Sequence, residues 1–453
     1  MAAWCEPGML NVAVKVAVIG AGWAGCAAAV QAVRLGHQVT LFEASRTPGG
    51  RARRVDVTHN GQALVLDNGQ HILIGAYSET LKLMADLGVD ADTAMLRVPL
   101  SMQFPNGSGL QLAHWPAPLD ALLGIASARG WSWRDKASLL TTATAWQLRK
   151  FQCPPEQSVA ELCRKLTPQV MATLIEPLCV SALNTPADRA SGQVFLRVLR
   201  DALFSTTGGS NLLLPRVDLS ALLPDAAIAW LTANGATVKM GSRVNQLALL
   251  GARWQLGLAV GGAADQIDDR LEIGSAATHF DQVILACPVN AAINLLQTTG
   301  LSCAAWLNCA NQLTYEAITT VYALSSAGSL AQPMLALASN SEFPAQFVFD
   351  RGQLGGPAGL LAFVISASSA DAQTLASRVA AQASAQLGLR DLAVVQTIVE
   401  KRATFACTPN LQRPPQHIAA GLVAAGDYVD GPYPATLEGA VRSGLQAASL
   451  LNK

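Results

Sequence analysis

A glycine-rich turn near the N-terminus limits the fold more than any other feature of this sequence. The apolar run Val14–Ile19 leads into Gly20-Ala21-Gly22-Trp23-Ala24-Gly25, and an alanine-rich segment, a predicted helix, runs on to Gly36. His37–Phe42 forms a second apolar run, closed by Glu43. The pattern predicts two parallel strands joined by a crossover helix, the βαβ unit of dinucleotide-binding folds.

Each glycine of this turn has a physical task. Gly20 permits the tight turn, Gly22 lets a pyrophosphate approach the backbone, and Gly25 lets the helix pack closely on the strand. The phosphates would then lie at the helix N-terminus, where backbone N–H groups and the helix dipole favour an anion. Glu43 would accept hydrogen bonds from the adenosine ribose hydroxyls. Because its carboxylate would repel a 2′-phosphate, the sequence disfavours NADP.

Two further segments fit the flavin end of such a cofactor. In Gly49-Gly50-Arg51, the two glycines let the backbone pass close to a ligand. The Arg51 guanidinium can bind a phosphate or flavin oxygen. Gly426-Asp427 follows an apolar strand, and its carboxylate can bind a ribityl hydroxyl. Pro434–Ala440 begins a helix whose N-terminal dipole would favour the reduced flavin anion. The three pieces in this order predict an FAD-binding fold built from both ends of the chain.

The composition narrows the function classes. Of 453 residues, 51% are hydrophobic and only 14% are charged, against about a quarter charged in an average globular domain. Basic and acidic residues number 31 each, so no basic surface for nucleic acid is indicated, and the shortage of charge points to apolar partners. The longest uncharged runs, Gln282–Tyr315 and Ala317–Ser341, are broken by proline and glycine and predict no transmembrane span. Met1–Val14 lacks a basic region and predicts no signal peptide.

The cysteines and histidines form no metal or disulfide pattern. None of the cysteines stands in a CxxC pair, and their spacing matches neither zinc clusters nor a small disulfide scaffold. We expect buried thiols in a reducing cytoplasm. His59, His114, His279 and His417 show no spacing typical of a metal site.

The rest of the chain predicts both helices and strands. Pro99–Ala113 predicts a hairpin around Asn106-Gly107, and Trp115–Phe151 is predicted to be helical with a second start at the capping box Ser132-x-x-Asp135. A mostly helical stretch follows at 159–203. Strands are predicted at 236–250, 254–260, 280–287, 317–324, 346–349, 360–366 and 422–425, and helices at 371–387 and 436–451.

Segments typical of a nucleotide-binding fold therefore occur at the start, middle and end of the chain. The predicted fold class is α/β, a Rossmann-like FAD-binding domain interleaved with an α+β substrate-binding domain. The FAD-binding domain is expected to comprise residues 1–75, 225–290 and 400–453. The substrate-binding domain is expected to comprise residues 76–224 and 291–399, with a helical part at about 115–205.

Four segments resemble one family. They are GAGWAGCAAA, LFEASRTPGGRAR, LDNGQHILIGAY and AGDYVDGPYPATLEGAVRSG, and they resemble the flavoprotein amine oxidase and carotenoid desaturase superfamily over the whole length of the chain. Within it the chain looks most like the hydroxysqualene dehydroxylases, also called squalene-associated FAD-dependent desaturases. Trp23, Asn68–His71 and the PATLEGA stretch are the closest likenesses. Leu178–Ser191 resembles a substrate-domain segment of plant-type phytoene desaturases.

The resemblance implies further cofactor contacts. The backbone of Val244 should bind the adenine, and Asn68–His71 should lie near the flavin. A catalytic role for His71 competes with a structural one, which is commoner for a histidine in an apolar segment. Cys287 is expected in the core, because no basic neighbour in sequence would lower its pKa. No metal site is expected, and the predicted cofactor-binding residues are Gly20, Gly22, Trp23, Ala24, Gly25, Glu43, Ala44, Gly50, Arg51, Asn68, Gly69, Gln70, His71, Val244, Gly426, Asp427, Thr436 and Leu437.

The resemblance also implies an activity, the removal of an allylic hydroxyl from hydroxysqualene with hydride from reduced flavin, giving squalene for hopanoid or triterpenoid biosynthesis. The sequence identifies neither the electron donor nor the catalytic acid. Asp218, Glu176 and Asp350 are carboxylates in apolar surroundings, with none preferred, and a water network on the substrate is an alternative. A carotenoid (phytoene-type) desaturase is the second reading, and an amine oxidase is less favoured. A lipid-binding protein of the Rab GDP-dissociation-inhibitor type would share the fold but lack the FAD-binding residues.

A cluster of tryptophans marks the helical region. Trp115, Trp131, Trp133 and Trp146 precede Arg149-Lys150. Interfacial tryptophans with basic neighbours suit a protein resting on one membrane leaflet, from which an apolar triterpene can enter without crossing water. Aromatic residues at helical spacing are equally typical of a core. Both readings stay open, and the expected location is the cytoplasm, with peripheral contact to the cytoplasmic membrane face under the first reading.

Overall fold

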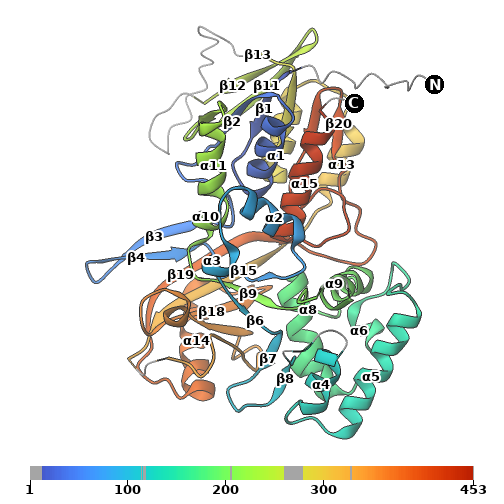
Figure 1. Cartoon of the computed structure of the whole chain (residues 1–453), viewed down its shortest axis with the longest axis vertical. Helices are drawn as coiled ribbons and strands as arrows, with labels where there is room; N and C mark the ends of the chain where they lie inside the picture. The colour runs from blue at the N-terminus through green and yellow to red at the C-terminus, as the bar shows by residue number, and fades with distance from the viewer. Residues whose placement is uncertain are drawn as a thin grey trace, which may run out of the picture.

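A mostly parallel sheet carries the glycine-rich turn. The computed structural model describes residues 13–113, 115, 119–204, 207–259, 279–326 and 329–451. The strand order is β10-β2-β1-β14-β21-β20, and each neighbouring pair is parallel except the last. The strands come from the start, middle and end of the chain and lie in the upper half of the molecule (Figure 1). They are β1 (Lys15–Ile19), β2 (Gln38–Phe42), β10 (Thr237–Lys239), β14 (Gln282–Leu285), β20 (His417–Ala419) and β21 (Leu422–Ala424).

Helices from opposite ends of the chain pack together on this sheet. α1 (Trp23–Arg34) contacts both α15 (Leu437–Ser449) and α11 (Pro224–Ala233), and the three helices stand side by side (Figure 1). The close approach depends on glycine, because a Cβ atom on Gly444 of α15 would collide with the Ala24 carbonyl of α1. The packing of α15 on α1 therefore joins the C-terminal segment to the N-terminal βαβ unit.

Smaller elements surround the parallel sheet. A three-stranded antiparallel sheet lies above it, and the hairpin β3–β4 projects sideways between the two halves (Figure 1). The elements are β11 (Val244–Leu250), β12 (Arg253–Leu258), β13 (His279–Phe280), β3 (Arg54–His59), β4 (Gln62–Asp67), α12 (Val289–Thr298) and α13 (Ala304–Asn311).

A five-stranded antiparallel sheet forms the lower half, in the order β16-β17-β18-β15-β19. α14 (Ala372–Leu387) covers one face, where Val321 and Phe363 pack against Val379. Successive side chains of a strand point to opposite faces, so Ile318, Phe347 and Val364 face the other way. The strands are β15 (Tyr315–Leu324), β16 (Met334–Ala336), β17 (Phe347–Asp350), β18 (Leu360–Ser366) and β19 (Ala393–Phe405).

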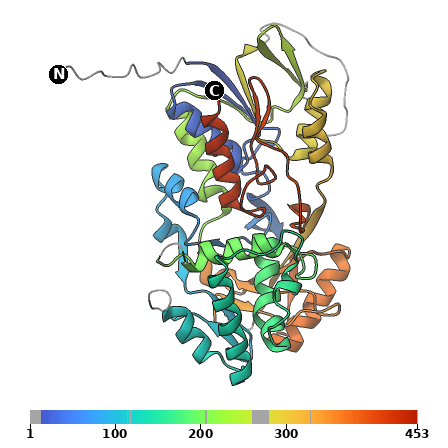
Figure 2. The same ribbon diagram turned by 90° about the vertical axis from the view of Figure 1, so that its right-hand side faces the viewer.

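A helical region packs beside this sheet, below the parallel sheet (Figure 2). The predicted capping box is confirmed, since Ser132 and Asp135 exchange both hydrogen bonds at the start of α5. Across the described residues, no helix combines the length and apolar character needed to cross a bilayer. The helices are α4 (Leu119–Ser127), α5 (Trp133–Leu148), α6 (Val159–Leu162), α7 (Pro168–Val170), α8 (Glu176–Leu183) and α9 (Gly192–Phe204), with a π-helical turn at Met171–Ile175 between α7 and α8.

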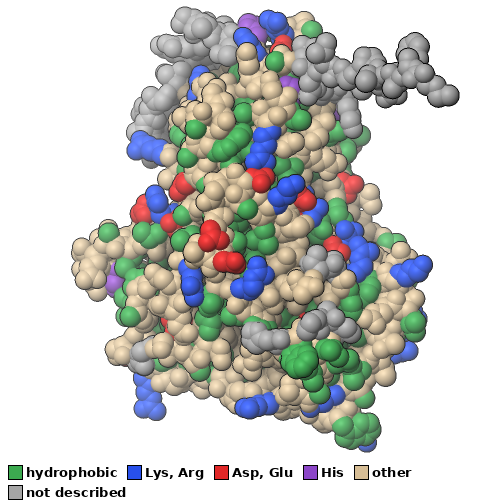
Figure 3. Space-filling model, in the orientation of Figure 1, with side chains coloured by type: hydrophobic (Ala, Val, Ile, Leu, Met, Phe, Trp, Pro, Cys, Tyr) green, Lys and Arg blue, Asp and Glu red, His purple; other side chains and the backbone are tan. Residues whose placement is uncertain are grey.

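The four tryptophans divide between core and surface. Trp131 and Trp146 are 7% and 6% exposed, and the indole of Trp131 donates a hydrogen bond to Thr173. Trp115 and Trp133 are 60% and 74% exposed. Hydrophobic side chains gather on the surface at the lower end of the molecule, over this helical region (Figure 3). The core reading therefore holds for two of the four tryptophans and fails for the other two.

The remaining elements join the two halves. The hairpin predicted around Asn106-Gly107 is confirmed as β7 and β8. The mixed α/β fold class is confirmed, but the sequence pattern misses β3, β4, β16, β19 and β20 and the short strands at 73–74, 95–98 and 212–215. The domain boundaries stay a prediction, and one of them, at residue 400, falls within β19. The joining elements are β5 (Leu73–Ile74), β6 (Met95–Val98), β7 (Ser101–Gln103), β8 (Gly109–Gln111), β9 (Leu212–Pro215), α2 (Ser78–Asp86), α3 (Ala91–Ala94) and α10 (Leu219–Leu222).

Three sequence predictions concern residues outside the described ranges. Nearly all of the Met1–Val14 segment, for which no signal peptide is predicted, lies outside them. His114, and Val260 at the end of a predicted strand, do so as well.

Candidate active site

Residues from both halves of the molecule line one cavity of about 600 Å³. α1 and α15 contribute their first residues, Trp23 and Leu437, and the lower sheet contributes the side chains of Ile318, Phe347 and Val364. The structure thus brings the start, middle and end of the chain to one place. The predicted cofactor-binding residues that line the cavity are Gly20, Gly22, Trp23, Ala24, Glu43, Gly50, Arg51, Asn68, Gly69, Gln70, His71, Gly426, Asp427, Thr436 and Leu437.

Three predicted residues in the described part of the chain stand outside this lining. Gly25 packs beneath the turn, where an added Cβ would collide with the Gly20 carbonyl. Ala44 follows Glu43, and Val244 begins β11. Contact of the Val244 backbone with an adenine stays a prediction.

The glycine turn presents bare backbone to the cavity. Gly20 has a φ of +110°, and a Cβ there would lie 2.6 Å from the Ala286 carbonyl oxygen. Gly22 is the N-cap of α1 and has no side chain over the helix N-terminus. Gly49 donates its N–H to Ala21 O at 2.8 Å, which fixes the second glycine segment against the first. Free N–H groups and a helix dipole at one point form a site for a phosphate.

Glu43 holds the turn from the end of β2. Its Oε2 accepts the Ala21 N–H at 2.6 Å, and its Oε1 accepts the Ser45 N–H at 2.8 Å. A carboxylate oxygen has a second lone pair, so each oxygen can still accept a ribose hydroxyl. The predicted ribose contact is compatible with this geometry and stays a prediction.

Arg51 and Asp427 form an ion pair across the cavity wall. Arg51 Nη2 lies 2.6 Å from Asp427 Oδ1, and Arg51 Nη1 donates to Ala403 O at 2.6 Å. Desolvation opposes the charge of Arg51, but the Asp427 carboxylate offsets this, and the pKa of Arg51 is raised. The pair links the Gly50 segment, β19 and the strand end at Gly426. The separate roles predicted for the two side chains toward a phosphate and a ribityl hydroxyl stay predictions.

The Asn68–His71 segment crosses the wall beside this pair. Asn68 Nδ2 donates to Arg51 O at 3.1 Å and to Glu400 Oε2 at 3.2 Å. His71 Nδ1 lies 2.7 Å from Gly69 O, and desolvation lowers the pKa of His71, so the neutral ring donates Nδ1–H to that carbonyl. This local hydrogen bond supports the structural reading of His71, while its place in the wall leaves contact with a ligand open.

A buried ion pair supports this segment from behind. Arg351 Nη2 lies 3.8 Å from Asp67 Oδ2, and Arg351 Nη1 donates to Gln70 Oε1 at 3.4 Å. Asp67 also accepts the Leu219 N–H at 2.9 Å. Burial raises the pKa of Asp67 to about 6, because the nearby Arg351 only partly offsets the loss of solvent. The pair anchors the segment to elements of both halves.

Tyr428 provides a direct test of whether a cofactor fits. Its ring is 3% exposed, it lines the cavity, and its hydroxyl has no hydrogen-bond partner among the described residues. A buried hydroxyl without a partner is costly unless a ligand supplies one. Together with the bare glycine turn, the unpaired hydroxyl fits a ligand that carries phosphates at one end and polar groups along its length. FAD has this chemistry.

Cys287 differs from its predicted place. It follows β14 at the cavity and lines the wall, where we expected it in the core. The end of a parallel strand opens onto the ligand crevice of such sheets, which explains the position. Desolvation raises the pKa of the Cys287 thiol to about 12, so it stays protonated and is no nucleophile near neutral pH.

The lower wall of the cavity is mainly apolar, with one carboxylate on its surface. Ile318, Phe347, Phe349 and Val364 line it from the antiparallel sheet. Glu400 pairs with Ile318 across β15 and β19, so its side chain projects from the same face. It is a functional candidate that the sequence reading misses, because β19 itself is not recognised. The β-branched residues of the stretch VVQTIV, at 394–399, are a signal for that strand.

The three carboxylates considered from sequence lie elsewhere. Asp218 caps α10 by accepting the Ser220 and Ala221 N–H groups. Asp350 is fully buried and accepts hydrogen bonds from Leu330 and Gln353. Glu176 is exposed at the start of α8. None of the three is among the residues that line the described cavity.

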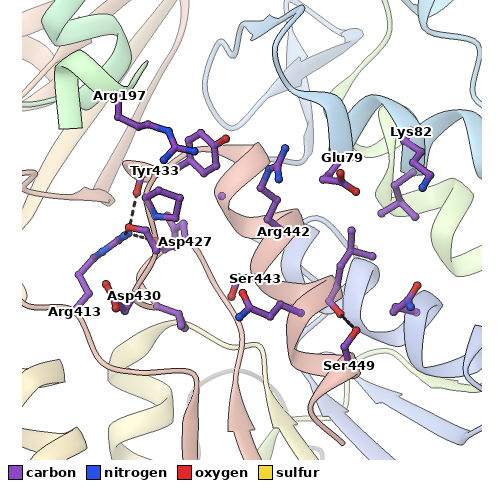
Figure 4. Close-up of a pocket in the computed structure, with 18 of the residues that line it drawn as sticks. Glu79, Lys82, Arg197, Arg413, Asp427, Asp430, Tyr433, Arg442, Ser443 and Ser449 are labelled. Atoms are coloured by element: carbon purple, nitrogen blue, oxygen red, sulfur yellow. Dashed lines mark hydrogen bonds between the residues drawn. The ribbon is translucent and has the colours of Figure 1, made fainter. Parts of the chain in front are cut away.

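A second, outer groove of about 570 Å³ lies along α15, α2 and the loop 427–433 (Figure 4). Its arginines have protein partners: Arg413 donates to Tyr433 O at 2.9 Å, and the Arg197 and Arg442 guanidinium groups lie over the Tyr433 ring. Asp427 faces both cavities, so the 427–433 loop forms the wall between them. We expect the cofactor in the cavity that contains the glycine turn.

The chain is similar to known proteins in sequence and in structure. A family model described as flavin containing amine oxidoreductase matches residues 23–452. Hydroxysqualene dehydroxylase of Rhodopseudomonas palustris is 28% identical, over 96% of this chain and 98% of that protein. The Sinorhizobium fredii protein of the same name is 27% identical over the same shares of the two chains. Zeta-carotene desaturase of Zea mays is 38% identical, but only over 17% of this chain and 13% of that protein.

The fold recurs among solved structures. An oxidoreductase from Methanosarcina mazei matches with a TM-score of 0.68, at 17% identity, over 96% of this chain and 99% of that one. At this identity the likeness shows the fold alone. The structural likeness extends over nearly the whole length of both proteins.

Proposed function

The chain belongs to the family of flavin containing amine oxidoreductases, whose model spans residues 23–452, and from this premise we propose that it removes the hydroxyl of hydroxysqualene to give squalene. The protein is an FAD-dependent oxidoreductase. The observation that carries the substrate proposal is the apolar lower wall, where Ile318, Phe347, Phe349 and Val364 face the cofactor cradle. A triterpene chain needs such a surface. The two hydroxysqualene dehydroxylases described above match over 96% of this chain.

The upper wall provides the contacts for FAD. The N–H groups at the start of α1, around Gly22, would hold the pyrophosphate, and Glu43 would hold the ribose. The start of α15, at Thr436 and Leu437, would place a positive dipole end near the flavin pyrimidine. When bound, FAD supplies reversible hydride transfer, while the protein orients the substrate and excludes water.

Loss of a hydroxyl requires a proton at the departing oxygen. The C–O bond breaks, the oxygen leaves as water, and the allylic cation that remains accepts a hydride. Glu400 is the carboxyl group on the apolar wall, within hydrogen-bond distance of Asn68 and two strands away from Val364. We propose that Glu400 passes a proton from solvent to the departing oxygen, so that it starts and ends each turnover as a carboxylate.

The decisive experiment is anaerobic turnover of hydroxysqualene by the reduced holoenzyme, with the product identified by mass. In deuterated water, squalene should carry deuterium at the former carbinol carbon, because reduced flavin exchanges its transferable hydrogen with solvent. Squalene without deuterium there would exclude the flavin as the hydride source. Desaturation of phytoene by the oxidised enzyme would instead support the carotenoid desaturase reading.

Glu400→Gln tests the assigned proton donor. The amide keeps the size and the contact with Asn68 but cannot give a proton, so kcat should fall about a hundredfold or more. FAD affinity should stay unchanged. The matched control Glu316→Gln changes a carboxylate on β15 that is absent from the lining and should leave kcat near the wild-type value. An unchanged kcat for Glu400→Gln would show that Glu400 is not the proton donor and would favour a water network on the substrate instead.

A further inference from the structure

Exposed apolar side chains gather on the outside of the helical region. Of thirteen large hydrophobic side chains exposed among the described residues, seven belong to residues 115–148. Large apolar patches on a monomer mark interaction sites, whereas isolated exposed leucines need no explanation. We call these seven the apolar face; they are Trp115, Leu119, Leu122, Leu123, Trp133, Leu140 and Leu148.

Beyond its first turn, α5 carries no charge on either its exposed or its buried side. Trp133 and Leu140 stand seven residues apart, two helical turns, and so share one side of the helix. Leu139 and Trp146 are buried on the other side. No charged residue occurs from Ala137 to Leu148. This exposed side is uncharged but mixed, because Thr141, Thr144 and Gln147 are exposed there as well as the leucines. It therefore presents no charge that would oppose contact with an apolar phase.

Basic side chains surround the apolar face. Arg129, Arg134, Arg149 and Lys150 are all exposed, at the ends of α4 and α5. The Arg134 guanidinium lies 5.6 Å from the Trp133 ring, which keeps a cation beside the most prominent aromatic side chain. Of the two acids in 119–150, Asp120 is half-buried and accepts the Ala121 N–H, and Asp135 is buried in the capping box. The exposed charge around the face is therefore positive, which complements an anionic surface.

A continuous run of helix connects this region to the cavity. α5 contacts α7, and α7 continues through the π-helical turn into α8, so the run covers residues 168–183. At 1.5 Å per residue it is about 24 Å long. Val180, Ser181 and Ala182 at its far end line the cavity. The helical region thus reaches from the apolar face to the proposed substrate wall.

We propose that α4 and α5 dock on one leaflet of an anionic phospholipid membrane. The leucines and tryptophans of the apolar face enter the boundary between headgroups and acyl chains, and the four basic side chains lie at the level of the phosphates. The choice of a lipid leaflet over a protein partner rests on the proposed function, because a triterpene substrate resides in the bilayer. Docking here would let the substrate pass from lipid toward α8 without entering water.

Vesicle binding by the FAD-loaded full chain tests the surface. The wild-type protein should float with vesicles of phosphatidylcholine and phosphatidylglycerol at 3:1 and bind pure phosphatidylcholine less well. Leu122→Ser/Leu123→Ser should weaken binding about tenfold or more, since two leucines no longer enter the interface. Leu249→Ser/Leu250→Ser, a matched change of two exposed leucines on β11, should leave binding unchanged. Equal loss in both double variants overturns the proposal.

Two further experiments test the basic side chains around the apolar face and the alternative that a second copy of the chain covers this face. Arg149→Glu should weaken binding to the anionic vesicles about fivefold or more, whereas Arg390→Glu, an exposed position on the lower sheet side, should not. Failure of the wild type to bind either vesicle overturns the proposal. So does a wild-type dimer that Leu122→Ser/Leu123→Ser converts to a monomer, because a second copy would then cover the face.

The outcome is separable from that of the proposed function. Vesicle flotation needs no substrate, and turnover can be measured with hydroxysqualene dispersed in detergent. Leu122→Ser/Leu123→Ser should keep the wild-type kcat in detergent, because neither leucine lines the cavity. A protein that binds vesicles but leaves hydroxysqualene unchanged would refute the substrate and retain the surface.

Discussion

The two walls of the cavity present different atoms to a ligand, mainly backbone atoms in the upper wall and side chains in the lower wall. Around Gly20, Gly22 and Gly50 the upper wall is backbone, and its chemistry comes from N–H groups and a helix end. The lower wall consists of side chains, such as Ile318 and Phe347, on an antiparallel sheet. A backbone wall suits a ligand that never changes, because it depends mainly on the absence of side chains. A side-chain wall can be altered one residue at a time, which suits a substrate that differs between relatives.

The largest expected effect separates two glycines of the glycine turn, Gly22 in the cavity wall and Gly25 beneath it. A Cβ on Gly22 would have Gly50 Cα, at 3.9 Å, as its nearest neighbour, so Gly22→Ala should leave the thermal stability of the apoprotein unchanged. It should nevertheless weaken FAD binding about a hundredfold, some 2.7 kcal/mol, because the methyl group occupies the phosphate position. Gly25→Ala should lower stability as well, since its methyl group meets the Gly20 carbonyl. Titration of apoprotein with FAD and a melting curve measure both; equal behaviour of the two variants would contradict the assignment of the phosphate to Gly22.

Glu43 is one of the side chains that the upper wall does contribute. Glu43→Arg should weaken FAD binding about tenfold to a hundredfold, because loss of a charged hydrogen bond costs roughly 1.5–3 kcal/mol. Glu43→Gln keeps the size and one acceptor oxygen and should lose less. Fluorescence titration with FAD gives both dissociation constants. An unchanged constant for the arginine variant would show that Glu43 serves only the Ala21 and Ser45 N–H groups.

A change in the lower wall should leave the cofactor unaffected. Ile318→Ser replaces an apolar contact with a hydroxyl and should raise KM for hydroxysqualene about tenfold. FAD affinity should not move. Val394→Ser, on β19 of the same sheet but 38% exposed, is the matched control and should change neither constant. Loss of FAD in Ile318→Ser would mean that the two walls are not independent.

Tyr428 tests for a polar side-chain contact from the upper wall. Tyr428→Phe removes the unpaired hydroxyl, so the apoprotein should be as stable as the wild type or more so. FAD binding should weaken about twofold to tenfold, the value of one hydrogen bond of roughly 0.5–1.5 kcal/mol. Burial raises the pKa of Tyr428 well above its ordinary value, so the effect should not vary between pH 6 and 9. Equal FAD affinity in the two proteins would show that the hydroxyl points away from the cofactor.

Asp67 stands at the junction of the walls and gives the smallest effect. Its pKa is raised from 3.8 to about 6 by burial, so the folded state holds the proton more tightly than the unfolded chain. The resulting stability is present below about pH 4 and is lost as the pH rises through 6. Asp67→Asn keeps the acceptor for the Leu219 N–H but cannot titrate, so its melting temperature should depend less on pH between 4 and 6. Parallel pH profiles for the two proteins would contradict the raised pKa.

The upper wall was the more accessible to prediction because its signals are local. The strand, glycine turn and helix of the βαβ unit are neighbours in sequence, as are Ser132 and Asp135 of the capping box. Glu400 joins the site only because β19 pairs with β15, a long-range contact that no short pattern encodes. Tyr428 stands beside Asp427, yet its unpaired hydroxyl depends on packing. The tryptophans show the same limit, since spacing alone could not separate buried Trp131 from exposed Trp133.

The strand order has a consequence for synthesis on the ribosome. β1 and β2 emerge early, but β14, the other neighbour of β1, and then β21 emerge much later, and α15 comes last. The βαβ unit must therefore wait, with one edge of β1 unpaired, while the chain between is made. Contacts of such large sequence separation form slowly. A nascent chain cannot complete the cradle until α15 has been released, so cofactor loading reports that synthesis has passed α15.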